Sequence, residues 1–186
     1  MKTVRGMKIG SHDASQLRSL DELMRIFGSA KRYAFNRLLE GRNAKDIIQH
    51  LPRPFRLNKR FAEDAVLLAQ SLISSQRELL PIRLEDVQAK IEKTEKKIEE
   101  YQHGRKTPKK VDLPTCLAGL QRQLEKLKSK ENELKHHLDQ GTIPRVIFGG
   151  KQNFYKRLKG NITNEEWKEL RSNQLYARGD KSKKGI

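Results

Sequence analysis

The side chains that most often carry out catalysis are present in this sequence, but their spacing does not assemble a reactive centre. Adjacent carboxylates occur at Glu99-Glu100 and Glu165-Glu166, and adjacent imidazoles at His136-His137. Neighbouring side chains on a helix diverge by roughly 100°, whereas a helical metal site needs ligands four residues apart. We therefore expect these pairs to be solvated or to cap helices.

Two further features fall short of known sites. Gly149-Gly150-Lys151 lacks the frame of a phosphate-binding loop, in which a glycine, four residues, a second glycine and lysine precede serine or threonine. Cys116 is the only cysteine, so the chain has no disulfide framework and no cysteine-based zinc site. We predict that the chain is not an enzyme and holds no metal or cofactor.

The basic residues give the stronger signal. The sequence has 40 Lys and Arg against 23 Asp and Glu, a net charge of +17, which favours a polyanionic partner and nucleic acid first among them. A membrane is the weaker alternative, because no apolar run approaches the roughly 18 residues of a spanning helix. The first residues, MKTVRGMKIG, lack the hydrophobic core of a signal peptide, and we expect a cytoplasmic protein.

Hydrophobic periodicity and capping motifs predict the elements before residue 82. Residues 2–9 are expected to form a strand. A helix is predicted to start at a capping box, Ser19 to Glu22, and to stop near Gly41. A short helix, 44–50, precedes a rigid loop at 51–54, and Asn58 is expected to cap a helix that Pro81 breaks or bends.

Two apolar seams then predict an antiparallel coiled-coil hairpin. The first arm carries Leu84, Val87, Ile91, Thr94, Ile98 and Tyr101, and the second carries Leu117, Leu120, Leu124, Leu127, Glu131, Leu134 and Leu138. We expect Glu131 to lie at a solvated end of the seam. The hairpin is either a spacer with solvated flanks or itself touches nucleic acid through Arg105, Lys106, Lys109 and Lys110.

The stretch RVIFGGKQNFYKRLKG, residues 145–160, differs from its surroundings. It is expected to form a strand at Val146–Phe148, a double-glycine turn and an aromatic-basic segment. A second capping box, Thr163 to Glu166, predicts a helix with Trp167 on its apolar face.

Residues 145–185 resemble the amino-terminal part of transposon-encoded, RNA-guided nucleases of the TnpB type and of the compact type V CRISPR effectors. The resemblance lies in VIFGGKQNFYKRLKG and ITNEEWKELRSNQLYARGDKSKKG, and YAFNRLLEG at 33–41 fits the usual order. It implies a mostly α fold with a small β part, in which a helical recognition lobe interrupts a partial wedge-type β-barrel. Residues 1–14 would be the first wedge strand, 15–143 the lobe with its hairpin at 83–140, and 144–186 the return to the wedge.

The RuvC-like nuclease domain of that family is not in this sequence, so the resemblance implies a non-catalytic subunit or fragment. Its expected partners are a structured guide RNA, target DNA with its adjacent motif, and a second protein chain carrying the nuclease half. In such proteins the protein recognises the RNA–DNA heteroduplex by shape and backbone. The alternative from a different class is a coiled-coil adaptor or inhibitor without guide function.

The residues expected to contact nucleic acid are basic, aromatic or polar. Gln70, Ser74, Ser75 and Gln76 either reach base edges or lie on a helix exterior. The full set is Lys31, Arg32, Arg37, Arg53, Arg56, Lys59, Arg60, Gln70, Ser74, Ser75, Gln76, Lys151, Asn153, Tyr155, Lys156, Arg157, Arg171, Arg178, Lys181, Lys183 and Lys184.

Overall fold

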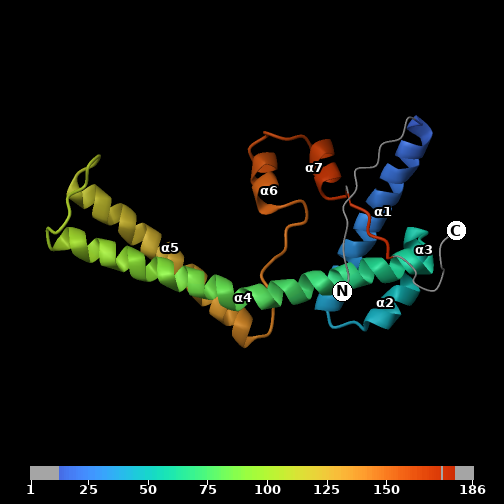
Figure 1. Cartoon of the computed structure of the whole chain (residues 1–186), viewed down its shortest axis with the longest axis horizontal. Coiled ribbons are helices and arrows are strands. Elements are labelled where there is room, and N and C mark those ends of the chain that lie inside the picture. The colour runs from blue at the N-terminus through green and yellow to red at the C-terminus, as the bar shows by residue number, and fades with distance from the viewer. Residues whose placement is uncertain (1–12, 173, 179–186) are drawn as a thin grey trace. The chain divides into compact units, whose positions relative to one another are not determined.

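The computed structural model describes residues 13–172 and 174–178, and this part of the chain is built from helices joined by short links (Figure 1). In chain order these helices are α1 (Ala14–Leu39), α2 (Ala44–His50), α3 (Pro52–Phe55), α4 (Lys59–Gln102), α5 (Leu113–Asp139), α6 (Lys151–Leu158) and α7 (Asn164–Leu170). The chain divides into a first unit, Met1–Ser71 with Val146–Ile186, and a second unit, Leu72–Arg145.

The predicted partial wedge-type β-barrel is wrong, because the described residues contain no β-strand. The strand expected at Val146–Phe148 is irregular chain that ends in a turn, closed by a hydrogen bond of 3.0 Å from Gly150 N to Ile147 O. Phe148 packs its ring edge against Phe35 of α1, with 5.3 Å between centroids. Phe148 therefore meets a helix instead of a neighbouring strand. The strand expected at 2–9 lies outside the described residues.

Helix α1 begins earlier than its sequence motif predicts. Asp13 is the N-cap, and its carboxylate accepts a hydrogen bond of 2.8 Å from Ser15 N. Ser19 lies inside the helix and its hydroxyl donates to Ser15 O at 3.0 Å. The predicted capping box at Ser19 is wrong because the helix begins six residues earlier, where Asp13 satisfies an orphan amide. The helix ends at Leu39 with Glu40 as its C-cap, and Gly41 follows with φ of 81°.

Small side chains bring helices close together in the core of the first unit. Phe27 of α1 is fully buried and meets Phe61 of α4 edge to face, with centroids 6.3 Å apart. The fully buried alanines of this core are Ala30, Ala34, Ala62, Ala65 and Ala69. Alanine adds little bulk to a helix surface, which allows neighbouring helices to pack closely.

Two prolines act differently from the prediction. Residues 52–55 form the helical turn α3, since Pro52 occupies its first position, where a missing N–H costs nothing. Pro81 lies inside α4, which runs unbroken to Gln102. Pro81 is exposed, as is Arg77, so water can satisfy the Arg77 carbonyl that proline leaves without a donor. Asn58 caps α4 as predicted, accepting from Phe61 N at 2.8 Å.

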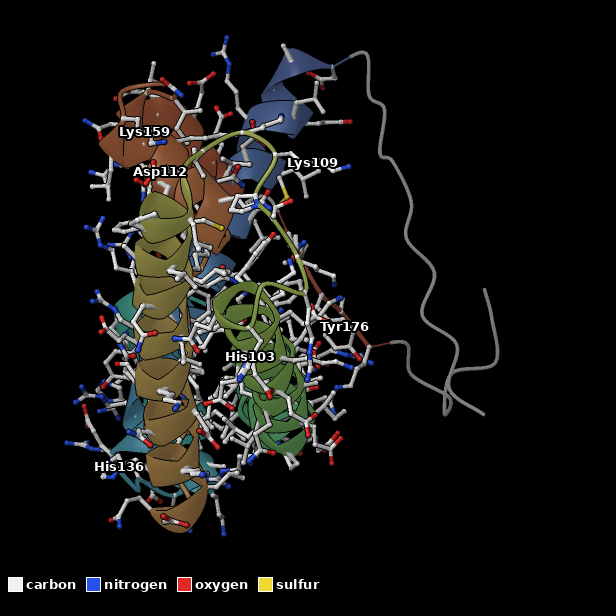
Figure 2. All side chains as sticks on the ribbon, turned by 90° about the vertical axis from the view of Figure 1, so that its left-hand side faces the viewer. His103, Lys109, Asp112, His136, Lys159 and Tyr176 are labelled. Carbon is white, nitrogen blue, oxygen red and sulfur yellow. The ribbon has the colours of Figure 1, made fainter. Side chains whose placement is uncertain are left out.

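The second unit is a helical hairpin made by α4 from Leu72 onward and by α5. The two helices lie side by side and run in opposite directions (Figure 1). Ile91, Ile98 and Leu124 form its buried cluster, and the half-buried residues packed on it are Val87, Leu117, Leu120 and Leu127. In Figure 2 the helices are joined by a loop between His103 and Asp112, and Asp112 caps α5 by accepting from Thr115 N at 3.1 Å.

Glu131 does not lie at a solvated end of the seam, as expected from the sequence. Its side chain is 17% exposed, and Leu134 beyond it is fully buried. Glu131 accepts a hydrogen bond of 3.0 Å from Gln88 of α4 and pairs with Lys135 at 2.7 Å. A polar link across the hairpin thus replaces an apolar contact at this step.

Candidate nucleic-acid interface

The positive charge of the chain is concentrated in the first unit. Residues 1–71 and 146–186 hold 24 Lys and Arg against 11 Asp and Glu, a net charge of +13. Residues 72–145 hold 16 against 12, a net charge of +4. A polyanion is therefore attracted mainly to the first unit.

Helix α6 and the residue that follows it present a group of exposed cations together with an aromatic ring. No acidic residue occurs from Gln140 to Asn164. Lys151, Lys156, Arg157 and Lys159 are exposed, and Figure 2 labels Lys159 just past the end of the helix. Tyr155 is 50% exposed and Leu158 65%. Such a surface can contact phosphates through its cations and stack a base on its tyrosine.

The opposite side of α6 anchors it to α7. Phe154 lies 6.0 Å from the ring of Trp167, which is buried. Gly149 has φ of 93°, and a β-carbon there would come within 2.9 Å of Trp167 and of Arg171. Asn153 donates to Gly149 O at 2.8 Å. Gly149 and Asn153 therefore have roles inside the fold, although the sequence predicted that Asn153 contacts nucleic acid.

A second exposed basic group surrounds α3. Arg53, Arg56 and Lys59 are exposed, and no acid occurs between residues 47 and 62. Arg56 has a left-handed φ of 50°, which ends the helical turn and separates α3 from α4. Three predicted contact residues thus remain accessible here.

Other predicted cations stabilise the packing of α1. Arg32 donates to Arg171 O at 3.0 Å and to Ser29 Oγ at 2.9 Å. The Lys31 ammonium lies 5.9 Å from the centroid of Phe148. Burial, and then the neighbouring charge of Arg32, lowers the pKa of Lys31, and burial followed by Arg171 lowers the pKa of Arg32. These side chains join segments of the first unit, and Arg171 adds a cation–π contact with Trp167 at 5.8 Å.

The segment 174–178 is tied to α4 by a buried carboxylate. Asp64 is fully buried and accepts from the backbone N of Arg178 at 3.1 Å and from its Nε. This hydrogen bond to Asp64 is the main reason that the pKa of Arg178 is raised. Arg60 donates to Arg178 O at 2.9 Å, so both predicted arginines serve this connection.

The polar residues late in α4 differ in availability. Ser74 donates to Glu78 at 2.9 Å, and Gln76 accepts from Arg83 at 3.0 Å. Gln70 and Ser75 are exposed. Lys181, Lys183 and Lys184 lie outside the described residues.

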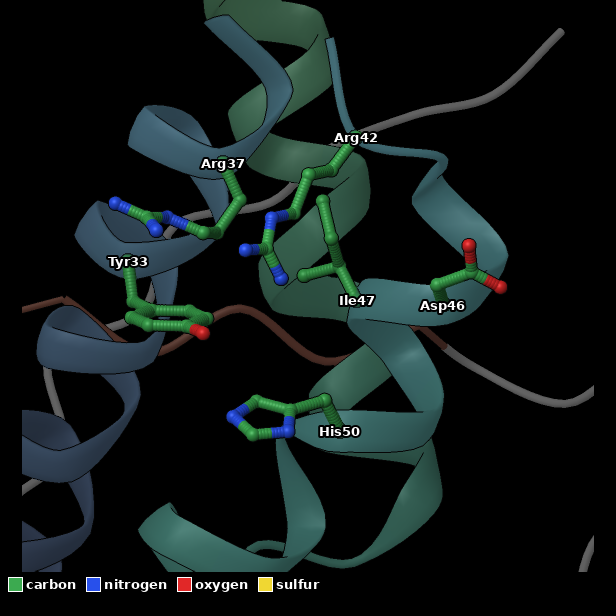
Figure 3. A pocket seen from close by; sticks show the side chains of 6 residues that line it. All are labelled: Tyr33, Arg37, Arg42, Asp46, Ile47 and His50. Atoms are coloured by element: carbon green, nitrogen blue, oxygen red, sulfur yellow. The ribbon is translucent and has the colours of Figure 1, made fainter. Parts of the chain in front are cut away.

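The structure also contains a pocket that sequence reasoning missed (Figure 3). Its volume is about 210 Å³ and its walls are Tyr33, Arg37, Arg42, Asp46, Ile47 and His50. Of these only Arg37 was predicted. The missed signal was the arrangement of Tyr33 and Arg37 one turn apart on α1, followed by His50 at the end of the next helix, because a helix pair brings such positions together.

Within residues 13–172 and 174–178, no group of three or more histidine, cysteine or acidic side chains is placed to hold a metal ion. None of the helices in that part combines the length and apolar character that crossing a membrane requires.

The chain is similar to a known family of protein domains. No curated protein and no solved structure matches the chain. The model of the SSO2105 N-terminal domain family matches residues 1–186. The chain therefore belongs to the SSO2105 N-terminal domain family.

Proposed function

We propose that this chain is a non-catalytic nucleic-acid-binding protein of the cytoplasm whose first ligand is structured RNA. The observation that carries the proposal is the surface of α6, where four exposed cations and a half-exposed tyrosine occur in a stretch without acidic residues. Phosphate contacts from lysine and arginine supply most of the affinity of such proteins. The exposed basic residues around α3 extend the same chemistry.

The resemblance of residues 145–185 to RNA-guided nucleases supports a narrower version. In that version the RNA is a guide, the chain also contacts target DNA and its heteroduplex, and a second protein chain supplies the nuclease. The irregular structure of Val146–Phe148 removes the barrel from that version, so its support is the sequence motif and the basic helix α6.

Salt dependence of RNA binding tests the proposal. With about five phosphate contacts, affinity should fall roughly 100- to 500-fold between 50 and 200 mM salt, because each contact contributes a slope of about 0.7–0.9. Filter binding or fluorescence anisotropy of the full chain with a labelled hairpin RNA measures this fall. An affinity independent of salt would contradict the proposal and favour the adaptor alternative.

A pair of matched variants locates the surface. Replacing Lys151 and Lys156 with glutamine should reduce the salt slope by about 1.4–1.8, from two lost phosphate contacts. Replacing Lys93 and Lys97 of the second unit, which are also exposed, removes the same charge and should leave the slope nearly unchanged. Equal losses in both variants would show that α6 is not the contact surface.

A further inference from the structure

The pocket beside the carboxyl-terminal half of α1 encloses arginine, tyrosine and histidine side chains in a cavity, whereas the basic residues of α6 and α3 lie on exposed surfaces. We propose that it binds a phosphate monoester at the end of a nucleic-acid strand. That the ligand is a nucleic-acid strand rests on the proposed function. That the bound group is a phosphate rests on the pocket alone.

The aromatic wall of the pocket is not available to a nucleobase. The guanidinium of Arg37 lies over Tyr33, 5.3 Å from its centroid, and His50 stacks on Tyr33 at 5.7 Å with 22° between the planes. Figure 3 shows these two groups on opposite faces of the ring. Phe55 packs edgewise at 5.7 Å. Tyr33 is therefore a fixed wall, and the polar groups must select the ligand.

Those polar groups favour an anion. Arg42 points its guanidinium into the pocket (Figure 3) and makes no ion pair with the described side chains. Arg37 pairs with Glu40 through a terminal nitrogen, whereas its buried Nε has no hydrogen-bond partner in the described part of the chain. Asp46 is the one carboxylate of the lining, and Figure 3 shows it directed away from Arg42. Two guanidinium groups with unused donors suit the oxygens of a phosphate.

The size of the pocket favours a terminal group. Its volume of about 210 Å³ has room for a phosphate group and the start of its ester. A phosphodiester inside a strand carries a nucleoside on each side of its phosphate, whereas a terminal monoester carries one, so the terminal group fits this volume better. Isolated nucleotides share this chemistry, but the net charge of +13 on this unit adds attraction for a longer polyanion.

Competition among RNA ends tests the proposal on the full chain. One short single-stranded RNA is prepared with a 5′-phosphate, with a 3′-phosphate or with hydroxyls at both ends, and each competes with a labelled RNA in fluorescence anisotropy. One phosphorylated form should bind about tenfold more tightly than the hydroxyl form, as expected for one charge-assisted hydrogen bond or more. Arg42→Gln should abolish this preference. Arg18→Gln, at an exposed position of α1 outside the pocket, removes the same charge and should keep it.

Equal affinity for all three RNAs, or a preference that survives in Arg42→Gln, would overturn the proposal while leaving RNA binding intact. If no RNA binds, the proposed function fails separately, and NMR of the Arg37 Nε–H during titration with a nucleoside monophosphate then tests the phosphate site. A shift that is absent in Arg42→Gln supports the site, and no shift overturns it. A free nucleotide that competes as well as the phosphorylated RNA would overturn the assignment to strand ends.

Discussion

Each unit of this protein is stabilised internally, and the kind of contact that does so differs between the two units. The second unit is one continuous segment whose helices share a repeated apolar seam centred on Ile91, Ile98 and Leu124. The first unit joins two segments that lie far apart in the sequence. Its long-range links include the hydrogen bond from Arg32 to Arg171 O, across 139 residues, and that from Arg178 N to Asp64, across 114.

This difference explains why basic residues have different roles in the two units. In the hairpin, lysines lie on the outside and form exposed pairs, such as Lys128 with Glu95 at 2.7 Å. In the first unit, Arg32 and Arg178 stabilise the fold by donating hydrogen bonds to part-buried acceptors. In the hairpin the apolar seam supplies the packing and the charged side chains lie in solvent. In the first unit some charged side chains also form hydrogen bonds within the fold.

Breaking the seam should produce the largest loss of stability. Leu134 is 1% exposed, so Leu134→Asp creates a cavity and buries a carboxylate, at a cost of about 3–5 kcal/mol. Leu138→Asp on the same helix, at a side chain 36% exposed, should cost less than about 1 kcal/mol. Urea unfolding followed by circular dichroism compares the two, and equal costs would contradict the assigned seam.

Adding one methyl group at Gly149 should lower the stability of the first unit markedly. Its φ of 93° and the 2.9 Å approach to Trp167 and Arg171 predict that Gly149→Ala costs about 2–4 kcal/mol. Gly160→Ala has a similar φ of 73° but open space around it, and should cost only about 1 kcal/mol. Trp167 fluorescence during unfolding reports the result, and a harmless Gly149→Ala would mean that the Trp167 contact is not rigid.

Asp64→Asn should weaken the link between α4 and residues 174–178. The fully buried carboxylate loses its charge-assisted bonds to Arg178, which costs about 1.5–3 kcal/mol. Glu63→Gln removes a longer, exposed contact of 3.4 Å to the same arginine and should change stability by less than about 0.5 kcal/mol. Hydrogen exchange at 174–178 should accelerate only in the first variant. Unchanged exchange would show that Asp64 does not hold this segment.

Helix spacing and capping were the most predictable parts of the fold. The hairpin residues repeat at three and four positions, and Thr163 and Glu166 form the predicted capping box, because both patterns depend on neighbours in the sequence. The predicted strand at Val146–Phe148 was wrong: the segment is irregular, and Phe148 packs on Phe35 of α1, a contact that sequence neighbours do not encode. Long-range contacts likewise decide that Arg32 serves the fold while Lys156 stays exposed. The relation to RNA-guided nucleases stays a prediction.

Acidification should give the smallest effect, and Glu131 of the hairpin is one of the groups that contribute to it. Hydrogen bonds from Lys135 and then from Gln88 lower the pKa of Glu131 from its ordinary value of 4.5. A lowered carboxyl pKa adds stability above the unfolded value, and this contribution is lost as the pH falls through the folded value. The second unit should thus weaken below about pH 4.5, and Glu131→Gln should make this decline shallower. An identical pH profile in the variant would exclude Glu131 as its source. Hydrogen exchange along α5, followed as a function of pH, measures the decline in the original chain and in the variant.

The division of the first unit into two segments sets an order of events during synthesis. All residues of the second unit, Leu72–Arg145, are contiguous, so its hairpin can form soon after residue 145 leaves the ribosome. Helix α1 is made well before its partners Phe148 and Arg171, and Asp64 of α4 is made well before Arg178. Part of the apolar face of nascent α1 therefore stays uncovered until those residues are made. Chains with exposed apolar surface are the ones that bind chaperones or aggregate.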